Sequence, residues 1–232
     1  IYPRLITLTP PWGTYAGNPQ HTGISRYASA MPQQIVWSDD IDPTNPAGPG
    51  QDVLAHYGSP VVSKLNTVVY PVTRNVASTY SFRARNGTTG AFLWQFDSDY
   101  TLCPGNWTPV VEGSIVLQNS YAMPGIGGSV YFRESVDAAS SPVHQYFFYG
   151  NANHASNQVW ADANIKICTP IMADGRGNMW FGYYVGDSNS IGSYVGGAPP
   201  AALAGLGRGD IVHLNSNGVG NYVTSATAAG DP

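Results

Sequence analysis

Three segments of this chain share one local pattern, and that repeat constrains the fold more than any other feature of the sequence. Each segment begins with a Ser/Thr-Pro dipeptide, continues with a short apolar run, turns, and ends in a second apolar run. Proline is tolerated at the first residue of a strand, so each dipeptide predicts a strand start. The paired runs are 57–62 with 67–70, 107–111 with 114–117, and 169–172 with 178–182.

The spacing of the repeat predicts the size of the unit. Pro60, Pro109 and Pro170 lie 49 and 61 residues apart, which is near the length of a four-stranded blade of a β-propeller. Two further strands are expected in each unit. No segment has a sustained 3.6-residue apolar period, so no long helix is predicted. The further strands are expected at 80–84 and 92–96, at 129–133 and 144–149, and at 210–214 and 221–223.

Turn chemistry supports the same division of the chain. Glu112-Gly113 and the Asp174–Asn178 segment supply the residues that tight hairpins need. The second segment resembles a calcium loop only weakly, because it lacks further acidic ligands, and a hairpin is expected there. Three stretches are expected to be loops: 42–52, 150–157 and 186–207, the last being a long insertion.

Composition places limits on function. Hydrophobic residues make up 43% of the chain and charged residues only 10%, against roughly 25% in ordinary soluble domains. The net charge of −4 gives no electrostatic basis for binding nucleic acid. No apolar run approaches the roughly 20 residues that a membrane-spanning helix needs. A surface built from uncharged polar residues favours an extracytoplasmic location, either secreted or periplasmic.

One segment carries a more specific motif. Ala84, Asn86, Gly90 and Trp94 stand in the order Ala-x-Asn, turn, Gly, and a Trp four residues after the Gly. Asn86 can bond its own turn, and Trp94 can present a large flat ring to the neighbouring blade. The motif resembles the tryptophan-docking motif of the quinoprotein-like (PQQ-type) β-propellers, with Asn86 in place of the Asp of that family. A degenerate copy is expected at 214–222, with Tyr222 near the Trp position.

The resemblance implies an all-β fold with about three blades of four antiparallel strands. Three blades cannot close a ring of roughly four to eight, so the ring is expected to be incomplete in this chain. The chain is treated as one partial propeller domain, 1–232. It comprises a lead-in with an outer strand at 1–52 and blades at 53–100, 101–165 and 166–232.

Candidate binding residues lie where the inner strands begin. His56, Tyr57, Asn106 and Trp107 are expected to line the axial opening of the ring, where propellers usually bind ligands, although simple packing of the rim is the alternative. The five histidines show no metal-ligand spacing, and no metal or catalytic residue is assigned.

The two cysteines occupy equivalent places in neighbouring units. Cys103 and Cys168 each precede an inner strand, so a disulfide between them would join two blades. Two buried free thiols are the alternative.

Three functions are compatible with this pattern. The preferred one is a non-catalytic scaffold that binds a protein or other partner, or the remaining blades, through its loops and ring faces. The resemblance also implies, as an alternative, part of a quinone (PQQ)-dependent dehydrogenase that would require PQQ and calcium. No cofactor is otherwise evident. The third is a structural subunit of an extracellular assembly.

Overall fold

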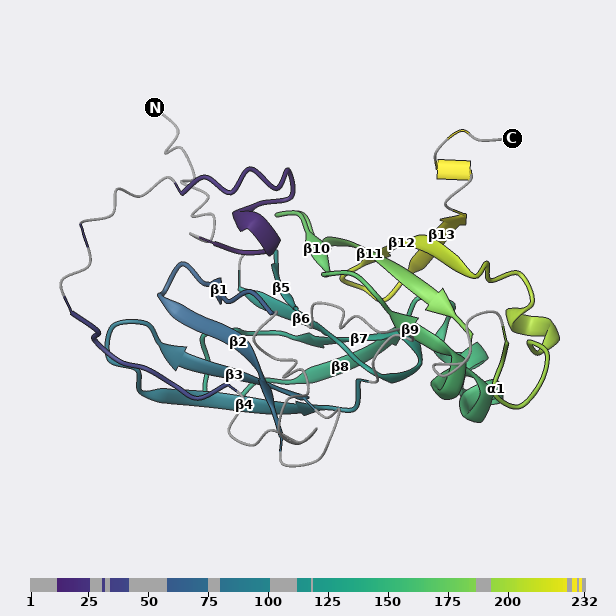
Figure 1. Cartoon of the computed structure of the whole chain (residues 1–232), viewed down its shortest axis with the longest axis horizontal. Coiled ribbons are helices and arrows are strands. Elements are labelled where there is room, and N and C mark those ends of the chain that lie inside the picture. Colours follow the sequence, from purple (N-terminus) through teal and green to yellow (C-terminus); the bar gives the residue numbers. More distant parts are fainter. Residues whose placement is uncertain are drawn as a thin grey trace, which may run out of the picture.

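The protein is built mainly from three antiparallel sheets that follow one another along the chain (Figure 1). The computed structural model describes residues 12–25, 31, 34–41, 58–74, 80–100, 112–117, 119–186, 193–224, 227–228 and 230. Each sheet pairs its main strands in sequence order, as short connections favour. The prediction of an all-β chain with about three four-stranded units is therefore confirmed at the level of its sheets.

Sheet 1 matches the predicted strands closely. Its edge strand β1 pairs with β2 through Val61 and Val69, and the register of β3 against β4 shifts next to Ala84. The shift is a β-bulge, with one extra residue on β4. The strands are β1 (Val61–Val62), β2 (Thr67–Thr73), β3 (Tyr80–Asn86) and β4 (Phe92–Ser98).

Sheet 2 departs from the prediction at its beginning. The run expected to be the second strand is β5, the first described strand of the sheet, and a strand that was not predicted, β6, follows it. The run 107–111, expected to be the first strand of this unit, lies outside the described residues, so the hairpin expected at Glu112-Gly113 stays a prediction. Both of these residues are buried ahead of β5, and a Cβ on Gly113 would collide with Ala122 O. A turn that was not predicted joins β5 to β6 and begins at Leu117, which has a φ of 56°. The strands are β5 (Ser114–Val116), β6 (Ser120–Pro124), β7 (Ser129–Arg133) and β8 (Val143–Phe147).

Sheet 3 has one strand more than predicted. The additional strand β9 pairs with the end of β11 through Ile167 and Tyr183. The hairpin expected at Asp174–Asn178 is confirmed, since Asp174 Oδ1 accepts the backbone N–H groups of Arg176 and Asn178 at 2.8 and 2.9 Å. The strands are β9 (Ile165–Ile167), β10 (Met172–Ala173), β11 (Asn178–Val185), β12 (Gly209–Asn215) and β13 (Gly220–Thr224).

A helix stands where the sequence predicted a loop. Helix α1 (Asn151–Asn164) connects sheets 2 and 3 and buries only Trp160, Ala161 and Asn164. Because so few of its residues are buried, its sequence lacks the 3.6-residue apolar period that would have predicted a helix. The helix is held by tertiary contacts with the 193–208 segment: Trp160 Nε1 donates to Gly197 O at 2.9 Å, and Asn164 Nδ2 donates to Val195 O at 3.0 Å.

Short 3₁₀ helices complete the described elements. They are η1 (Tyr15–Gly17), η3 (Ile126–Gly128) and η4 (Ala201–Leu203). The last lies in the predicted insertion, where Leu203 is buried, so the described part of that insertion packs onto the protein.

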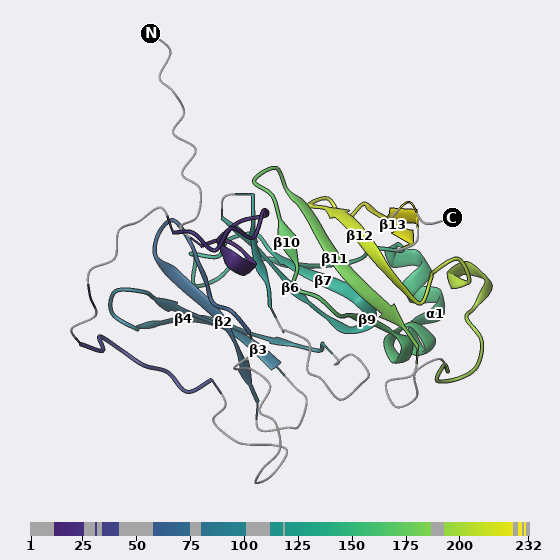
Figure 2. The same ribbon diagram turned by 45° about the horizontal axis from the view of Figure 1, so that its top comes forward.

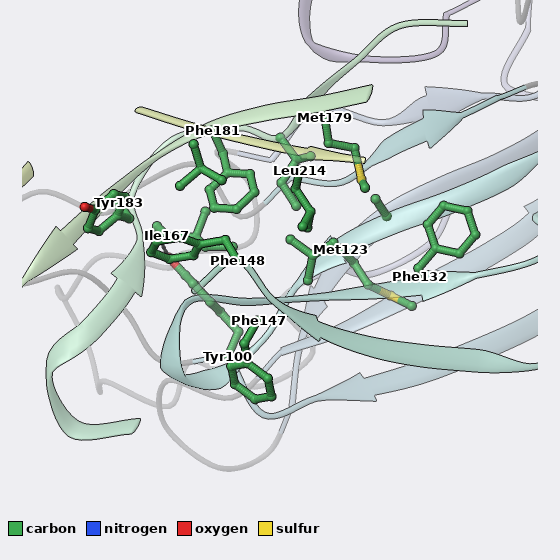
Figure 3. Packing of buried hydrophobic residues seen from close by; sticks show 14 of the residues in the cluster. Tyr100, Met123, Phe132, Phe147, Phe148, Ile167, Met179, Phe181, Tyr183 and Leu214 are labelled. Carbon is green, nitrogen blue, oxygen red and sulfur yellow. Dashed lines mark hydrogen bonds between the residues drawn. The ribbon is translucent and has the colours of Figure 1, made fainter. Parts of the chain in front are cut away.

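The sheets are stacked so that each buries one face against the next (Figure 2). Phe82 and Trp94 of sheet 1 pack on Tyr121 of sheet 2, with ring centroids 5.9 and 6.0 Å apart. Phe148, which follows β8, packs on Tyr183 of sheet 3 at 4.6 Å (Figure 3). The hydrophobic core is therefore continuous through all three sheets.

Candidate functional site

His56, Tyr57, Asn106 and Trp107 all lie outside the described residues. The inner strands that follow those residues, and the turns between strands, are described.

Turns from all three sheets form one continuous surface. We call it the turn face, and it consists of residues 63–66, 87–90, 117, 119, 134–142, 174–177 and 215–219. These segments connect the first strand of a sheet to the second, or the third to the fourth. Because neighbouring strands are antiparallel, these connections all lie at the same end of the strands in each sheet.

Hydrogen bonds tie the turns of the first two sheets together. Asn66 Nδ2 donates to Thr88 Oγ1 at 3.0 Å within sheet 1. Ser63 Oγ donates to Asp137 Oδ1 at 2.5 Å, and so joins sheet 1 to sheet 2. Val136 N then donates to Asn119 O at 2.6 Å within sheet 2. These bonds fix the relative positions of four turns.

Close packing continues the turn face into sheet 3. A Cβ on Gly177 would lie 2.9 Å from Leu117 Cδ2 and 2.8 Å from Ser216 Oγ. Gly177 has a φ of 94°, so both its backbone and its surroundings favour glycine. The β10–β11 turn is therefore wedged between a turn of sheet 2 and a turn of its own sheet.

The turn face and its margin expose large apolar side chains. Leu65 is 67% exposed, Leu117 37% and Val219 58%, and Phe92, at the start of β4, is 57% exposed. Turns usually carry Gly, Pro, Asn, Asp or Ser, so apolar side chains at these places are not needed to form the turns. Apolar groups held on a fixed surface are suited to contact with another macromolecule.

The predicted docking motif supports this surface from beneath. Asn86 Oδ1 accepts the backbone N–H groups of Thr88 and Thr89 at 2.9 and 3.0 Å, and Gly90 has a φ of 71°. Ala84 is fully buried on β3, opposite Trp94. The roles expected for these side chains within the turn are therefore present.

Trp94 reaches the neighbouring sheet. Its Nε1 donates to Val136 O at 2.7 Å, and the guanidinium of Arg133 lies 4.3 Å from the centroid of its ring. Arg133 also donates to Ala138 O at 2.7 Å, so the indole and the guanidinium together hold the 134–142 loop in place. An aromatic residue of one sheet thus fixes part of the turn face of the next.

Two other aromatic residues dock in the same direction, and the sequence analysis did not identify them. Trp37 Nε1 donates to Gly87 O at 2.9 Å, and a Cβ on Gly90 would lie 2.7 Å from Trp37 Cβ. Tyr146 of sheet 2 contacts the turn of sheet 3 so closely that a Cβ on Gly218 would collide with its ring. A detectable signal existed for Trp37, because Ile-Val-Trp at 35–37 resembles Phe-Leu-Trp at 92–94.

Tyr222 does not take the docking position expected for it. It packs back toward sheet 2, with its ring 6.0 Å from Phe148 and 6.4 Å from Tyr183. The bulge on β4 changes which face Trp94 occupies, whereas β12 and β13 pair without a shift. Because of this difference in register, Tyr222 lies on the face of sheet 3 that is directed toward sheet 2, whereas Trp94 lies on the face of sheet 1 that is directed toward the following sheet.

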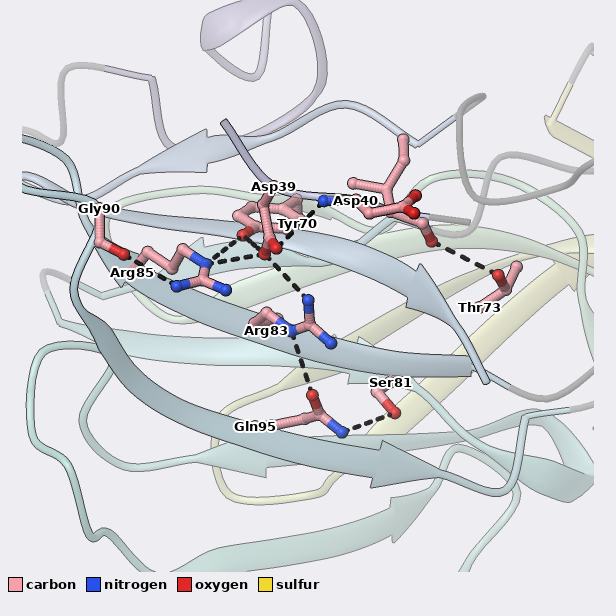
Figure 4. A network of polar contacts seen from close by, with 10 residues as sticks. Asp39, Asp40, Tyr70, Thr73, Ser81, Arg83, Arg85, Gly90 and Gln95 are labelled. Carbon is pink, nitrogen blue, oxygen red and sulfur yellow. Dashed lines mark hydrogen bonds and ion pairs between the residues drawn. The ribbon is translucent and has the colours of Figure 1, made fainter. Parts of the chain in front are cut away.

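Asp39 fastens the extended lead-in segment to sheet 1 (Figure 4). Arg85 Nε lies 2.7 Å and Arg83 Nη1 2.9 Å from Asp39 Oδ2, which Tyr70 also contacts. Burial alone would raise the pKa of Asp39, but the hydrogen bonds from Arg85, Tyr70 and Arg83 outweigh it and hold that pKa well below its usual range. Burial and the Asp39 charge raise the pKa of Tyr70 to about 12.

The first strands of the three sheets meet at residues 12–14. Trp12 pairs with Val62 of β1 through two backbone hydrogen bonds, and Gly13 O accepts the N–H of Ile115 of β5 at 2.7 Å. Thr14 Oγ1 lies 2.7 Å from Ser114 Oγ and donates to Ile171 O, just before β10, at 3.4 Å. The sequence predicts a lead-in with an outer strand at 1–52, but it does not predict this junction with the inner strands.

Glu112 is buried beside the same junction. Only 1% of its surface is exposed, and neither carboxylate oxygen has a hydrogen bond of normal geometry among the described residues. Burial raises the pKa of Glu112 to about 8, and the nearby backbone of Ser59 offsets only part of that rise. At neutral pH the protonated, uncharged form is therefore favoured.

The predicted disulfide stays a prediction. Cys103 lies outside the described residues. Cys168 follows β9 and is half-buried, and its backbone N–H donates to Gly182 O at 2.9 Å.

Across the described ranges, no group of three or more His, Cys, Asp or Glu is placed to hold a metal ion. No helix in that part of the chain has both the length and the apolar character needed to cross a membrane. A comparison with models of protein families finds no match for the chain, and a comparison with curated proteins finds none either.

Proposed function

We propose that this chain forms consecutive blades of an incomplete β-propeller and acts as a non-catalytic scaffold outside the cytoplasm. Its turn face would bind a protein partner. The observation that carries the proposal is the exposure of Leu65, Leu117 and Val219 on turns that the fold holds together.

The sheet order supports the propeller assignment. Each sheet is a meander, and the aromatic residues Trp94 and Tyr146 each dock on the turn face of the following sheet. Rigid sheets with loops at one end of their strands are well suited to recognition, because the scaffold orders the binding surface in advance. The low content of charged residues supports an extracytoplasmic location.

Photo-crosslinking tests the proposed surface. A photo-crosslinking amino acid is placed at Leu65, at Leu117 or, as a control, at Val159 of α1, which is 88% exposed. In the extracytoplasmic fraction of the producing cell, the two turn positions are expected to give the same discrete crosslinked product and Val159 none. Identical products from all three positions, or no product at the turns, would contradict the proposal.

A second assay tests the non-catalytic assignment. The purified chain is supplied with PQQ and calcium, and the reduction of a redox dye is measured with alcohols and sugars as substrates. No stimulated reduction is expected. Turnover that requires both additions would overturn the scaffold assignment in favour of the dehydrogenase.

A further inference from the structure

Both ends of the stack of sheets present apolar surface. We define the front face of each sheet as the face directed toward the following sheet in chain order, and the back face as the opposite one. The front face of sheet 1 is covered by sheet 2, and that of sheet 2 by sheet 3. These two internal contacts are both front-to-back.

The front face of sheet 3 follows from its register. Phe181, Val212 and Leu214 are buried toward sheet 2, so the alternate residues of β11 and β12 lie on the front face. Trp180 and His213 are cross-strand partners whose rings stack with centroids 5.3 Å apart.

Two aliphatic residues lie beside that aromatic pair on the front face of sheet 3. Ile211 is 44% exposed and its cross-strand partner Val223 is 39% exposed. Ile211 and Val223 therefore leave an apolar part of this face open to solvent. The front faces of sheets 1 and 2, by contrast, are each covered by the following sheet.

The back face of sheet 1 is covered by an extended segment, residues 34–41. Trp37 and Asp39 point toward the sheet, whereas Ile35 is 85% exposed and Val36 68% exposed. The segment is attached at its end by a hydrogen bond of 2.8 Å from Thr73 N to Ile41 O. The back of the stack is therefore a fixed surface that also carries exposed aliphatic side chains.

We propose that a second copy of this chain docks head-to-tail, with the front face of sheet 3 of one copy against residues 34–41 of the other. The contact continues the front-to-back order of the two interfaces already within the chain. A head-to-tail contact made twice closes a two-copy ring. Three sheets from each copy give six, which lies within the roughly four to eight blades of propellers. The inference rests on the proposed propeller architecture.

Mass measurement by light scattering during size-exclusion chromatography tests the proposal. The chain has a mass of 24.7 kDa, and a species of twice that mass is expected over a micromolar to submillimolar concentration series. A front variant, Ile211→Asp with Val223→Asp, and a back variant, Ile35→Asp with Val36→Asp, are each expected to lose the dimer. Val159→Asp on α1 is the matched control and is expected to retain it.

Mixing the two variants separates head-to-tail docking from other pairings. The mixture still contains one intact front face and one intact back face, so a heterodimer is expected where neither variant dimerises alone. A monomer at every concentration would overturn the proposal, as would a dimer that is insensitive to the back variant. Near-ultraviolet circular dichroism of each variant verifies folding. A monomer with an intact turn face would leave the proposed function standing, because the crosslinking assay does not depend on the dimer.

Discussion

Thr14 Oγ1 lies 2.7 Å from Ser114 Oγ, and this contact joins the lead-in segment to the first strand of sheet 2, one hundred residues later in the chain. Both side chains are buried, and Ser114 also contacts Ile171 O just before the first strand pair of sheet 3. A short polar link therefore lies where all three sheets meet.

Replacing Thr14 with Val tests how much this junction stabilises the fold. Thr14→Val keeps the shape of the side chain but leaves Ser114 without one partner in a buried place, so a loss of about 1–3 kcal/mol in the free energy of unfolding is expected. Urea denaturation measures it. Thr22→Val is the control, since Thr22 is exposed, and a change below about 0.5 kcal/mol is expected there. Equal losses in both variants would contradict a special role for Thr14.

Trp94→Phe tests the docking of sheet 1 on sheet 2. The variant keeps an aromatic ring but removes the N–H that donates to Val136 O, and a destabilisation of about 1–3 kcal/mol is expected. Trp37→Phe removes a similar bond to Gly87 O at a half-buried place and is expected to cost less. Thermal and urea unfolding of both variants checks this order, and the reverse order would show that the lead-in contact is the stronger one.

Glu112 is expected to make stability depend on pH. Its folded-state pKa of about 8 exceeds its ordinary value of 4.5, so the folded protein binds more protons in between. Stability from this group is complete below about pH 4.5 and is lost as the pH rises toward 8, by on the order of 5 kcal/mol.

Comparison of two variants isolates the contribution of Glu112. Glu112→Gln cannot titrate, so its free energy of unfolding is expected to fall less than that of the native protein between pH 5 and 8. Asp97→Asn is the control, because the Asp97 side chain is exposed and its hydrogen bond from Ser81 lowers its pKa, so the native slope between pH 5 and 8 is expected to persist. A native slope in Glu112→Gln would refute the assignment.

The cysteine pair is expected to form a disulfide. Alkylation of the unfolded, unreduced chain should leave its mass unchanged, and prior reduction should add two alkyl groups. Loss of the bond is expected to cost about 2–4 kcal/mol of stability. Two alkyl groups added without reduction would establish the free-thiol alternative for Cys103 and Cys168.

Local chemistry explains why sheet 1 could be predicted and the start of sheet 2 could not. Ser59-Pro60 and the Asn86 turn mark strand boundaries through backbone preferences that the sequence displays directly. Strand β6 carries no such mark, and Glu112-Gly113, which does, lies ahead of β5 and not at the β5–β6 turn. Helix α1 escaped prediction for a related reason: Trp160 and Asn164 hold it through partners more than 30 residues away.

The turn face was beyond sequence reasoning because it depends on contacts between sheets. Nothing local indicates that Ser63 meets Asp137, or that Gly177 packs on Leu117. The docking motif at Trp94 was predictable because its turn and its Trp lie within eleven residues of one another. Its target, Val136 O, was not, since that depends on which loop the stacking of the sheets brings beneath the indole.

An engineered crosslink between Thr14 and Ser114 tests whether the lead-in meets the inner strands where the sheets converge. Side chains with oxygens 2.7 Å apart are close enough for cysteines to bond, so Thr14→Cys with Ser114→Cys is expected to crosslink on mild oxidation. Peptide mapping by mass spectrometry would identify the linked 14–114 pair, and Thr22→Cys with Ser114→Cys is the control that should not link. A folded double variant that leaves positions 14 and 114 unlinked would contradict the account.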